Sequence, residues 1–209
     1  MDFENLAKAI GELDEESALP LLREAAAAGR EAASQAMEAC RKGMDIVGSL
    51  FEEGEYFVGD LIFAGELMTE AAEILKSALV GSSSQESAAK MIICTVQDDL
   101  HDIGKNIVKA MLEAAGFQVI DLGTDTDAQT IIEAAKAESV DIIALSGVLT
   151  LSLDSMESII SVLRKELPGC RVIIGGAPVS EEACKRTGAD EWAQSPQKTV
   201  NVCRAWAGI

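Results

Sequence analysis

The sequence predicts an α/β protein in which a helical bundle precedes a doubly wound, five-stranded parallel sheet. Residues 1–85 carry apolar side chains at helical spacing, whereas residues 90–209 alternate short apolar runs with helical segments. Between them, the run Gly81-Ser82-Ser83-Ser84-Gln85-Glu86-Ser87 has the composition of a flexible linker. We therefore expect two domains, at 1–85 and 90–209, joined by a hinge over 81–89.

The first half is rich in alanine, leucine, glutamate and methionine, with apolar residues recurring every three or four positions. This spacing predicts helices over 3–12, roughly 17–29, 31–48 and 57–79. Asp14 is placed to cap the second helix, and Gly29 and Gly54 mark breaks. Short helices with brief connections predict a small antiparallel bundle.

The second half contains short apolar runs that alternate with amphipathic helical segments. Strands are expected at 91–96, 117–122, 140–145, 170–174 and near 191–193, and helices at 103–115, 128–137, 153–167, 180–187 and from Pro196. Strands that are apolar on both faces indicate a parallel sheet covered on both sides. Five such units predict a flavodoxin-like (Rossmann-like) domain with strand order 2-1-3-4-5.

Charge and cysteine content exclude several classes of function. The formal net charge is −18, which argues against binding of free nucleic acid. The cysteines at 40, 94, 170, 184 and 203 form no C-x-x-C pair, so reduced thiols in a cytoplasm fit better than a disulfide framework. The N-terminus lacks the pattern of a signal peptide, and no apolar run approaches a membrane span.

The one histidine, His101, follows the first expected strand in the spacing D-x-H-x-x-G, with Asp99 before it and Gly104 after it. A carboxylate at that spacing suits an imidazole that binds a metal through its other nitrogen. A lone histidine is more often an ordinary surface or core residue, and it makes a poor zinc site because zinc needs three or four protein ligands. A metal at His101 must therefore bring most of its own ligands, as a macrocyclic cofactor does.

The expected strand order places three loops at one edge of the sheet, where ligands of such folds bind. They are the His101 loop, Ser146-Gly147-Val148-Leu149-Thr150-Leu151-Ser152 after strand 3, and Gly175-Gly176-Ala177 after strand 4. Their glycines permit close backbone approach and their hydroxyls offer neutral hydrogen bonds. No G-x-G-x-x-G follows strand 1 and a Walker A loop is absent, so a dinucleotide site is disfavoured.

These three motifs, in this order, resemble the cobalamin-binding module of methionine synthase and of the corrinoid proteins of methyltransferase systems. The extension His101-Asp102-Ile103-Gly104-Lys105-Asn106-Ile107-Val108 is similar to the methyltransferase branch in particular. The run Leu50-Phe51-Glu52-Glu53-Gly54-Glu55-Tyr56-Phe57-Val58 is similar to the signature of the helical cap that precedes the module in that branch. The resemblance covers nearly the whole chain.

The resemblance implies a role for each matching residue. His101 would be the lower axial ligand of cobalt, Asp99 would hydrogen-bond its imidazole, and Ser152 would continue the relay to solvent. Methyl-Co(III) would keep the histidine and Co(I) would release it, so this triad would gain a proton on reduction. The other cofactor-binding residues implied are Asp98, Leu100, Asp102, Gly104, Ser146, Leu149, Thr150, Gly175, Gly176 and Pro196, with Phe51 and Val58 of the cap over the upper face.

The resemblance further implies a methyl-carrying subunit of a multi-component methyltransferase system that is not catalytic alone. Its cofactor would be cobalamin or a related corrinoid, with methylcobalamin as the loaded state. Its partners would be a substrate-specific methyltransferase, an acceptor methyltransferase that serves tetrahydrofolate or a thiol, and a reductive activator protein, within anaerobic one-carbon metabolism. The methyl donor, whether methylamine, methanol, a methoxylated aromatic or a betaine, is left open.

Three alternatives share parts of the pattern. A small subunit of an adenosylcobalamin-dependent mutase would usually lack the helical cap. A cobalamin-binding sensor or regulator shares cap and carrier but normally adds a DNA-binding module, which the acidity disfavours. A phosphoacceptor receiver domain needs an aspartate at the end of strand 3, where this chain has Ser146.

Overall fold

A computed structural model describes residues 2–79 and 89–208 of the chain. The chain divides into two compact units, Met1–Ser87 and Ala88–Ile209. All but the last residue of the hinge expected at 81–89 lies outside the described residues. No helix within 2–79 and 89–208 is long and apolar enough to cross a membrane.

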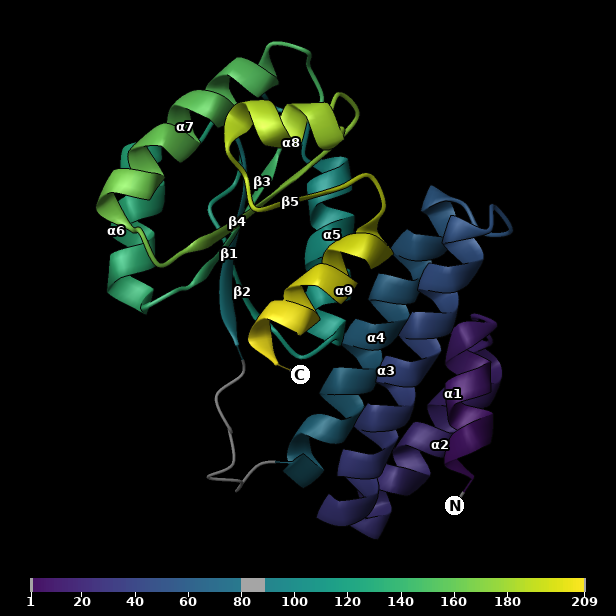
Figure 1. The fold of residues 1–209 in the computed structure, drawn as a ribbon. Coiled ribbons are helices and arrows are strands. Elements are labelled where there is room, and N and C mark those ends of the chain that lie inside the picture. The colour runs from purple at the N-terminus through teal and green to yellow at the C-terminus, as the bar shows by residue number, and fades with distance from the viewer. Residues whose placement is uncertain (1, 80–88, 209) are drawn as a thin grey trace. The chain divides into compact units, whose positions relative to one another are not determined.

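The N-terminal unit consists of helices α1 (Phe3–Gly11), α2 (Glu15–Ala28), α3 (Arg30–Glu52) and α4 (Val58–Leu79) (Figure 1). Asp14 caps α2 as expected, because its carboxylate accepts a hydrogen bond from the Ser17 backbone N–H at 3.1 Å. Helix α3 runs four residues beyond the expected end at 48, and Gly48 lies buried inside it. Gly54, with φ of 79°, follows that helix, as the sequence predicted.

Small residues let the helices of this unit pack closely. A side chain at Gly43 of α3 would overlap Ile10 of α1, since its Cβ would lie 2.5 Å from the Ile10 Cβ. Alanines of α2, α3 and α4 are buried alongside leucines, in a set that includes Ala18, Ala25, Ala33, Ala36, Leu61, Ala64, Ala71 and Leu75. Close backbone approach therefore adds to the burial of large side chains such as Ile10 and Leu22 in holding the expected bundle together.

The C-terminal unit is the expected doubly wound sheet. Its elements are β1 (Lys90–Thr95), α5 (Ile103–Ala114), β2 (Gln118–Asp121), α6 (Ala128–Glu138), β3 (Ile142–Ser146), α7 (Ser152–Glu166), β4 (Arg171–Gly175), α8 (Glu181–Thr187), β5 (Glu191–Ala193) and α9 (Pro196–Ala207). All pairs of neighbouring strands are parallel, and the order β2-β1-β3-β4-β5 confirms the prediction.

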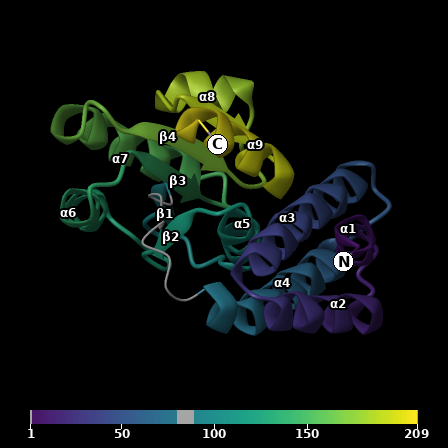
Figure 2. The same ribbon diagram turned by 90° about the horizontal axis from the view of Figure 1, so that it is seen from below.

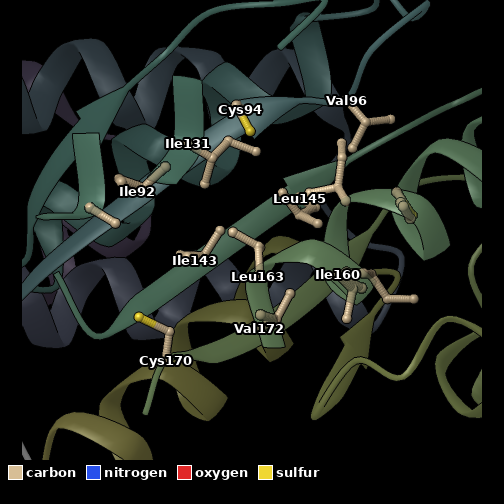
Figure 3. Close-up of a cluster of buried hydrophobic side chains, with 14 of the residues drawn as sticks. Ile92, Cys94, Val96, Ile131, Ile143, Leu145, Ile160, Leu163, Cys170 and Val172 are labelled. Atoms are coloured by element: carbon tan, nitrogen blue, oxygen red, sulfur yellow. The ribbon is translucent and has the colours of Figure 1, made fainter. Parts of the chain in front are cut away.

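Helices cover both faces of this sheet, and α6 and α5 lie on opposite sides of it (Figure 2). Because side chains alternate along a strand, one face of each central strand joins the core beneath α6, α7 and α8. Figure 3 shows that core, to which β1 contributes Ile92 and Cys94 and β3 contributes Ile143 and Leu145. Burial on both faces explains the continuous apolar runs of the sequence.

Candidate functional site

The candidate site lies at the carboxyl edge of the sheet, where three strands end level with one another. In the parallel register, Thr95 of β1 pairs with Ser146 of β3, and Ser146 pairs with Gly175 of β4. The loop after β1, the loop after β3 and the loop after β4 therefore leave the sheet side by side. The order β2-β1-β3 also puts the topological switch point beside β1, as predicted.

Asp99 is the hub of the site. Its side chain is fully buried, and its Oδ1 accepts the His101 backbone N–H at 3.0 Å and lies 2.7 Å from Nδ1 of the His101 ring. Its Oδ2 accepts the Ser152 hydroxyl at 2.6 Å and the Val148 backbone N–H at 2.7 Å, with the Leu149 N–H at 3.3 Å. The carboxylate thus ties the loop after β1 to the loop after β3.

These hydrogen bonds decide the charge of Asp99. Burial alone would raise the pKa of its carboxyl group. The hydrogen bonds from Ser152, His101 and Val148 outweigh burial and hold that pKa well below its usual range. Asp99 is therefore a carboxylate at neutral pH, and it can only accept hydrogen bonds.

The charge of Asp99 in turn fixes the tautomer of His101. Since a carboxylate has no hydrogen to give, Nδ1 must carry the ring proton in the 2.7 Å contact. A neutral imidazole with its proton on Nδ1 has a free electron pair on Nε2, on the far side of the ring from Asp99. The His101 side chain is 55% exposed, so it is accessible to a ligand, while the buried Asp99 carboxylate fixes the orientation of its ring.

Apolar side chains are exposed around this imidazole. The loop after β1 and the first residue of α5 expose Leu100 and Ile103, and the loop after β3 exposes Val148, Leu149 and Leu151. Large apolar side chains left in solvent at one edge of a sheet are typical of a binding surface. The arrangement suits a ligand that combines a metal with a broad apolar body.

The glycines of the site divide into two kinds. A Cβ at Gly104 would meet nothing within 4 Å, so this position leaves open space next to the His101 loop. At Gly176, where φ is 122°, a Cβ would lie 1.9 Å from the Gly147 carbonyl oxygen. Gly176 is therefore required by the chain's own backbone, whereas nothing in the described residues requires glycine at position 104.

The other residues singled out in this unit follow the carboxyl ends of the strands, at the same edge. Asp98, Asp102 and Thr150 are exposed in the loops, while Ser146 and Gly175 are half-buried at the ends of β3 and β4. Ser152, which was expected to continue the hydrogen-bond relay from His101 and Asp99 to solvent, is only 3% exposed. Pro196 begins α9 shortly after the end of β5, whose Ala193 pairs with Gly175 of β4, and its role stays a prediction.

In the helical unit, Phe51 is half-buried near the end of α3 and Val58 is exposed at the start of α4. Phe57, next to Val58, is 69% exposed and was not singled out from the sequence. An apolar residue directly before a helix gives no sequence signal of exposure. Their proposed place over a cofactor remains a prediction.

Sequence reasoning also missed the backbone donors of Val148 and Leu149. Backbone N–H groups carry no residue-specific signal, and these lie 49 and 50 positions from Asp99. The sequence did predict that the two loops converge, which brings these donors within reach. Among the described residues, no three His, Cys, Asp or Glu side chains gather as ligands for a bare metal ion.

A corrinoid fits these features. It brings cobalt inside a macrocycle, so a single protein nitrogen such as His101 Nε2 suffices. The exposed leucine, isoleucine and valine side chains suit the apolar ring, and the open space at Gly104 leaves room beside the histidine. The buried carboxylate behind the imidazole would orient the ligand and raise its basicity.

Comparisons with known proteins agree with this fit. Residues 89–200 match a family described as a B12 binding domain, and residues 2–76 match a second family of the same description. A corrinoid protein of Desulfitobacterium hafniense is 33% identical over 99% of this chain and 97% of its own. The trimethylamine corrinoid protein 1 of Methanosarcina acetivorans is 34% identical over 94% of this chain and 93% of its own.

Solved structures give the same result. A cobalamin-binding protein from Desulfitobacterium hafniense is 42% identical, with a TM-score of 0.87 over 98% of both chains. A chain of the methanol:cobalamin methyltransferase complex of Methanosarcina barkeri is 26% identical, with a TM-score of 0.78 over 98% of this chain and 79% of that one. The chain therefore belongs to the corrinoid proteins of methyltransferase systems, and its cofactor is cobalamin or a related corrinoid.

Proposed function

We propose that this chain is a methyl carrier that binds its corrinoid in the base-off, His-on form, with His101 in place of the cofactor's own nucleotide base. It receives a methyl group on a substrate:corrinoid methyltransferase and delivers it on a second methyltransferase. The observation that carries the proposal is the exposed His101 imidazole whose Nδ1 is held by the buried Asp99 carboxylate. The bound corrinoid supplies the cobalt that accepts and gives up the methyl group.

The protein's own groups would control the histidine. Asp99 holds the proton on Nδ1 of His101, which keeps the Nε2 electron pair available for cobalt. Ser152 and Val148 hold Asp99 from the other side at 2.6 and 2.7 Å, so that the carboxylate cannot turn away. When the histidine leaves the metal, the same bonds would keep its ring in place for religation and allow it to take up a proton.

The helical unit would act as a cap over the upper face of the corrinoid, with domain bounds at 1–85 and 90–209. Phe57, Val58 and Ile62 expose apolar side chains around the start of α4. Such side chains would exclude water from the methyl group. The cap must then open for each methyltransferase, and we place the hinge in residues 81–89.

The relatives support a methyl-carrying role and leave the donor open. Their names include trimethylamine and dimethylamine corrinoid proteins, and one solved relative belongs to a methanol:cobalamin methyltransferase complex. A partner methyltransferase therefore fits this chain too. We further propose an acceptor methyltransferase and a reductive activator protein as partners. We also propose a cytoplasmic location, because the five cysteines are free and buried, which suits a reducing compartment.

Chemical methylation tests the carrier role without knowledge of the donor. The chain is loaded with hydroxocobalamin, reduced with titanium(III) citrate, treated with methyl iodide and desalted. We expect about one methyl group per chain to be retained, because a carrier holds the group until a partner removes it. A chain that binds cobalamin but cannot be methylated while the cofactor is bound would refute the carrier role.

A further inference from the structure

We propose that Asp125, in the loop after β2, is a positioning residue for Asp99 and His101. This loop comprises residues 122–127, and nothing in their sequence pattern marks a functional site. The inference deepens the proposed function, since it rests on His101 as the axial ligand. It concerns what holds the His101 loop on the side away from β3.

Asp125 makes two hydrogen bonds to the backbone of Asp98 and Asp99, just before the histidine. Its Oδ1 accepts the Asp98 backbone N–H at 2.8 Å, and its own backbone N–H donates to the Asp99 carbonyl oxygen at 3.1 Å. One residue thus holds the backbone at both ends of the Asp98–Asp99 pair. The Asp99 side chain is fixed by the loop after β3, so its backbone and its carboxylate are held by different loops.

The conformation of Asp98 shows why these hydrogen bonds are needed. Asp98 has φ of 66° and Asp125 has φ of 54°, so both residues lie in the left-handed region that glycine prefers. Aspartate tolerates this region only at a cost, and contacts elsewhere must stabilise it. The bond from the Asp98 N–H to Asp125 is such a contact, and its loss would let the backbone before Asp99 relax.

The rest of the loop reinforces the same segment through Thr95, which is fully buried at the end of β1. Its N–H donates to the Gly123 carbonyl at 2.9 Å, and its carbonyl accepts the Thr126 N–H at 3.1 Å. The Thr95 hydroxyl then donates to the His101 carbonyl at 3.0 Å. The loop after β2 is therefore linked to the backbone of both Asp99 and His101.

The alternative is that Asp125 only shapes a turn. Asp127 provides a matched control, since it is an exposed aspartate two residues further on whose carboxylate also accepts a backbone N–H at 2.8 Å. That bond, from Thr130, caps α6 and does not reach the His101 loop. Asp125→Ala and Asp127→Ala thus each remove one backbone hydrogen bond made by a carboxylate of the same loop, and only the first bond reaches the segment that carries His101.

The test measures hydroxocobalamin affinity, the tautomer of the single imidazole by 15N NMR in the cofactor-free protein, and the urea midpoint. We expect Asp125→Ala to weaken affinity on the order of tenfold and to populate both tautomers, as loss of outer contacts to a metal ligand does. Asp125→Asn, which keeps the acceptor oxygen, should stay within about twofold of wild type. Asp127→Ala should match wild type in hydroxocobalamin affinity and in the tautomer of His101, even if its urea midpoint falls.

Equal binding by Asp125→Ala and wild type would overturn the inference, as would an equal loss in Asp127→Ala. If Asp125→Ala does not fold, Asp125→Glu replaces it, because the longer side chain keeps the charge and misplaces the acceptor. Wild-type affinity in Asp125→Glu would then overturn the inference. His101→Ala, measured in parallel, distinguishes failure of this inference from failure of the proposed function. If His101→Ala keeps the wild-type visible spectrum of bound cobalamin, the His-on proposal itself fails.

Discussion

Asp99→Asn tests whether the buried carboxylate sets the state of His101. The substitution replaces two acceptor oxygens by one oxygen and one amide NH₂. The fixed backbone donors of Val148 and Leu149 face the Oδ2 position, so the amide oxygen should occupy it. The NH₂ group then faces the His101 ring, where Nδ1 must become the acceptor. The ring proton moves to Nε2, and the nitrogen proposed to bind cobalt is blocked.

The cost to folding follows from the same contacts. The His101 backbone N–H, which donates to Oδ1 at 3.0 Å, would face another donor and lose its partner, at about 1–3 kcal/mol. The bonds from Ser152, Val148 and the ring would change from charge-assisted to neutral, at about 1 kcal/mol each. Relief from burying a charge offsets part of this, so we expect about 3 kcal/mol less stability at pH 7.

Two measurements on the cofactor-free protein check this prediction. Long-range 1H–15N NMR reads the tautomer directly, because His101 is the one histidine in the sequence. Urea unfolding gives the change in stability. Asp98→Asn is the control, since it makes the same chemical change at an exposed neighbour and should leave both readings unchanged. An Asp99→Asn protein that keeps the proton on Nδ1 and loses less than about 0.5 kcal/mol would refute the reasoning.

Three further predictions follow from the same geometry. Because the folded-state pKa of Asp99 lies below its ordinary value of 3.8, its contribution to stability is present above that pH and is lost as pH falls below it. Urea unfolding between pH 5 and pH 3 should therefore show a steeper loss for wild type than for Asp99→Asn, and parallel curves would contradict this. Gly104→Ala should raise the stability of the cofactor-free protein by about 0.5–1 kcal/mol, since alanine favours the helix more than glycine does and its Cβ would enter open space. The same Cβ should weaken hydroxocobalamin binding, and unchanged binding would show that the cofactor does not use this space. Gly176→Ala should cost about 3 kcal/mol or more, because its Cβ would overlap the Gly147 carbonyl, and a near-neutral urea midpoint would contradict that reason for the glycine.

The sheet was predictable because burial on both faces leaves a direct trace in the sequence. Runs such as Met91–Val96 and Cys170–Ile174 are apolar at every position but one, and each is followed by a helical segment. That pattern restricts the fold to a parallel sheet, and the fold then places the loops. The end of α3 was missed because Gly48 lies inside a helix, where it is buried by close packing.

The site was predictable only where its chemistry resides in side chains close in sequence. Asp99 and His101 are two residues apart, so their pairing could be read from spacing. The donors of Val148 and Leu149 are backbone groups, which any residue type would supply. Asp125 is an exposed acidic residue in a loop, and its sequence pattern does not distinguish it from a solvated charge. Its contact with Asp98 became apparent only from the fold.

The most direct test of the central claim is electron paramagnetic resonance of the chain bound to cobalamin in the Co(II) state. The protein is grown with 15N-labelled histidine, which places the label in His101 alone. If Nε2 of His101 is the axial ligand, the nitrogen splitting should be a doublet, since 15N has a nuclear spin of one half. A triplet from the unlabelled nitrogen of the cofactor's own base would contradict the account.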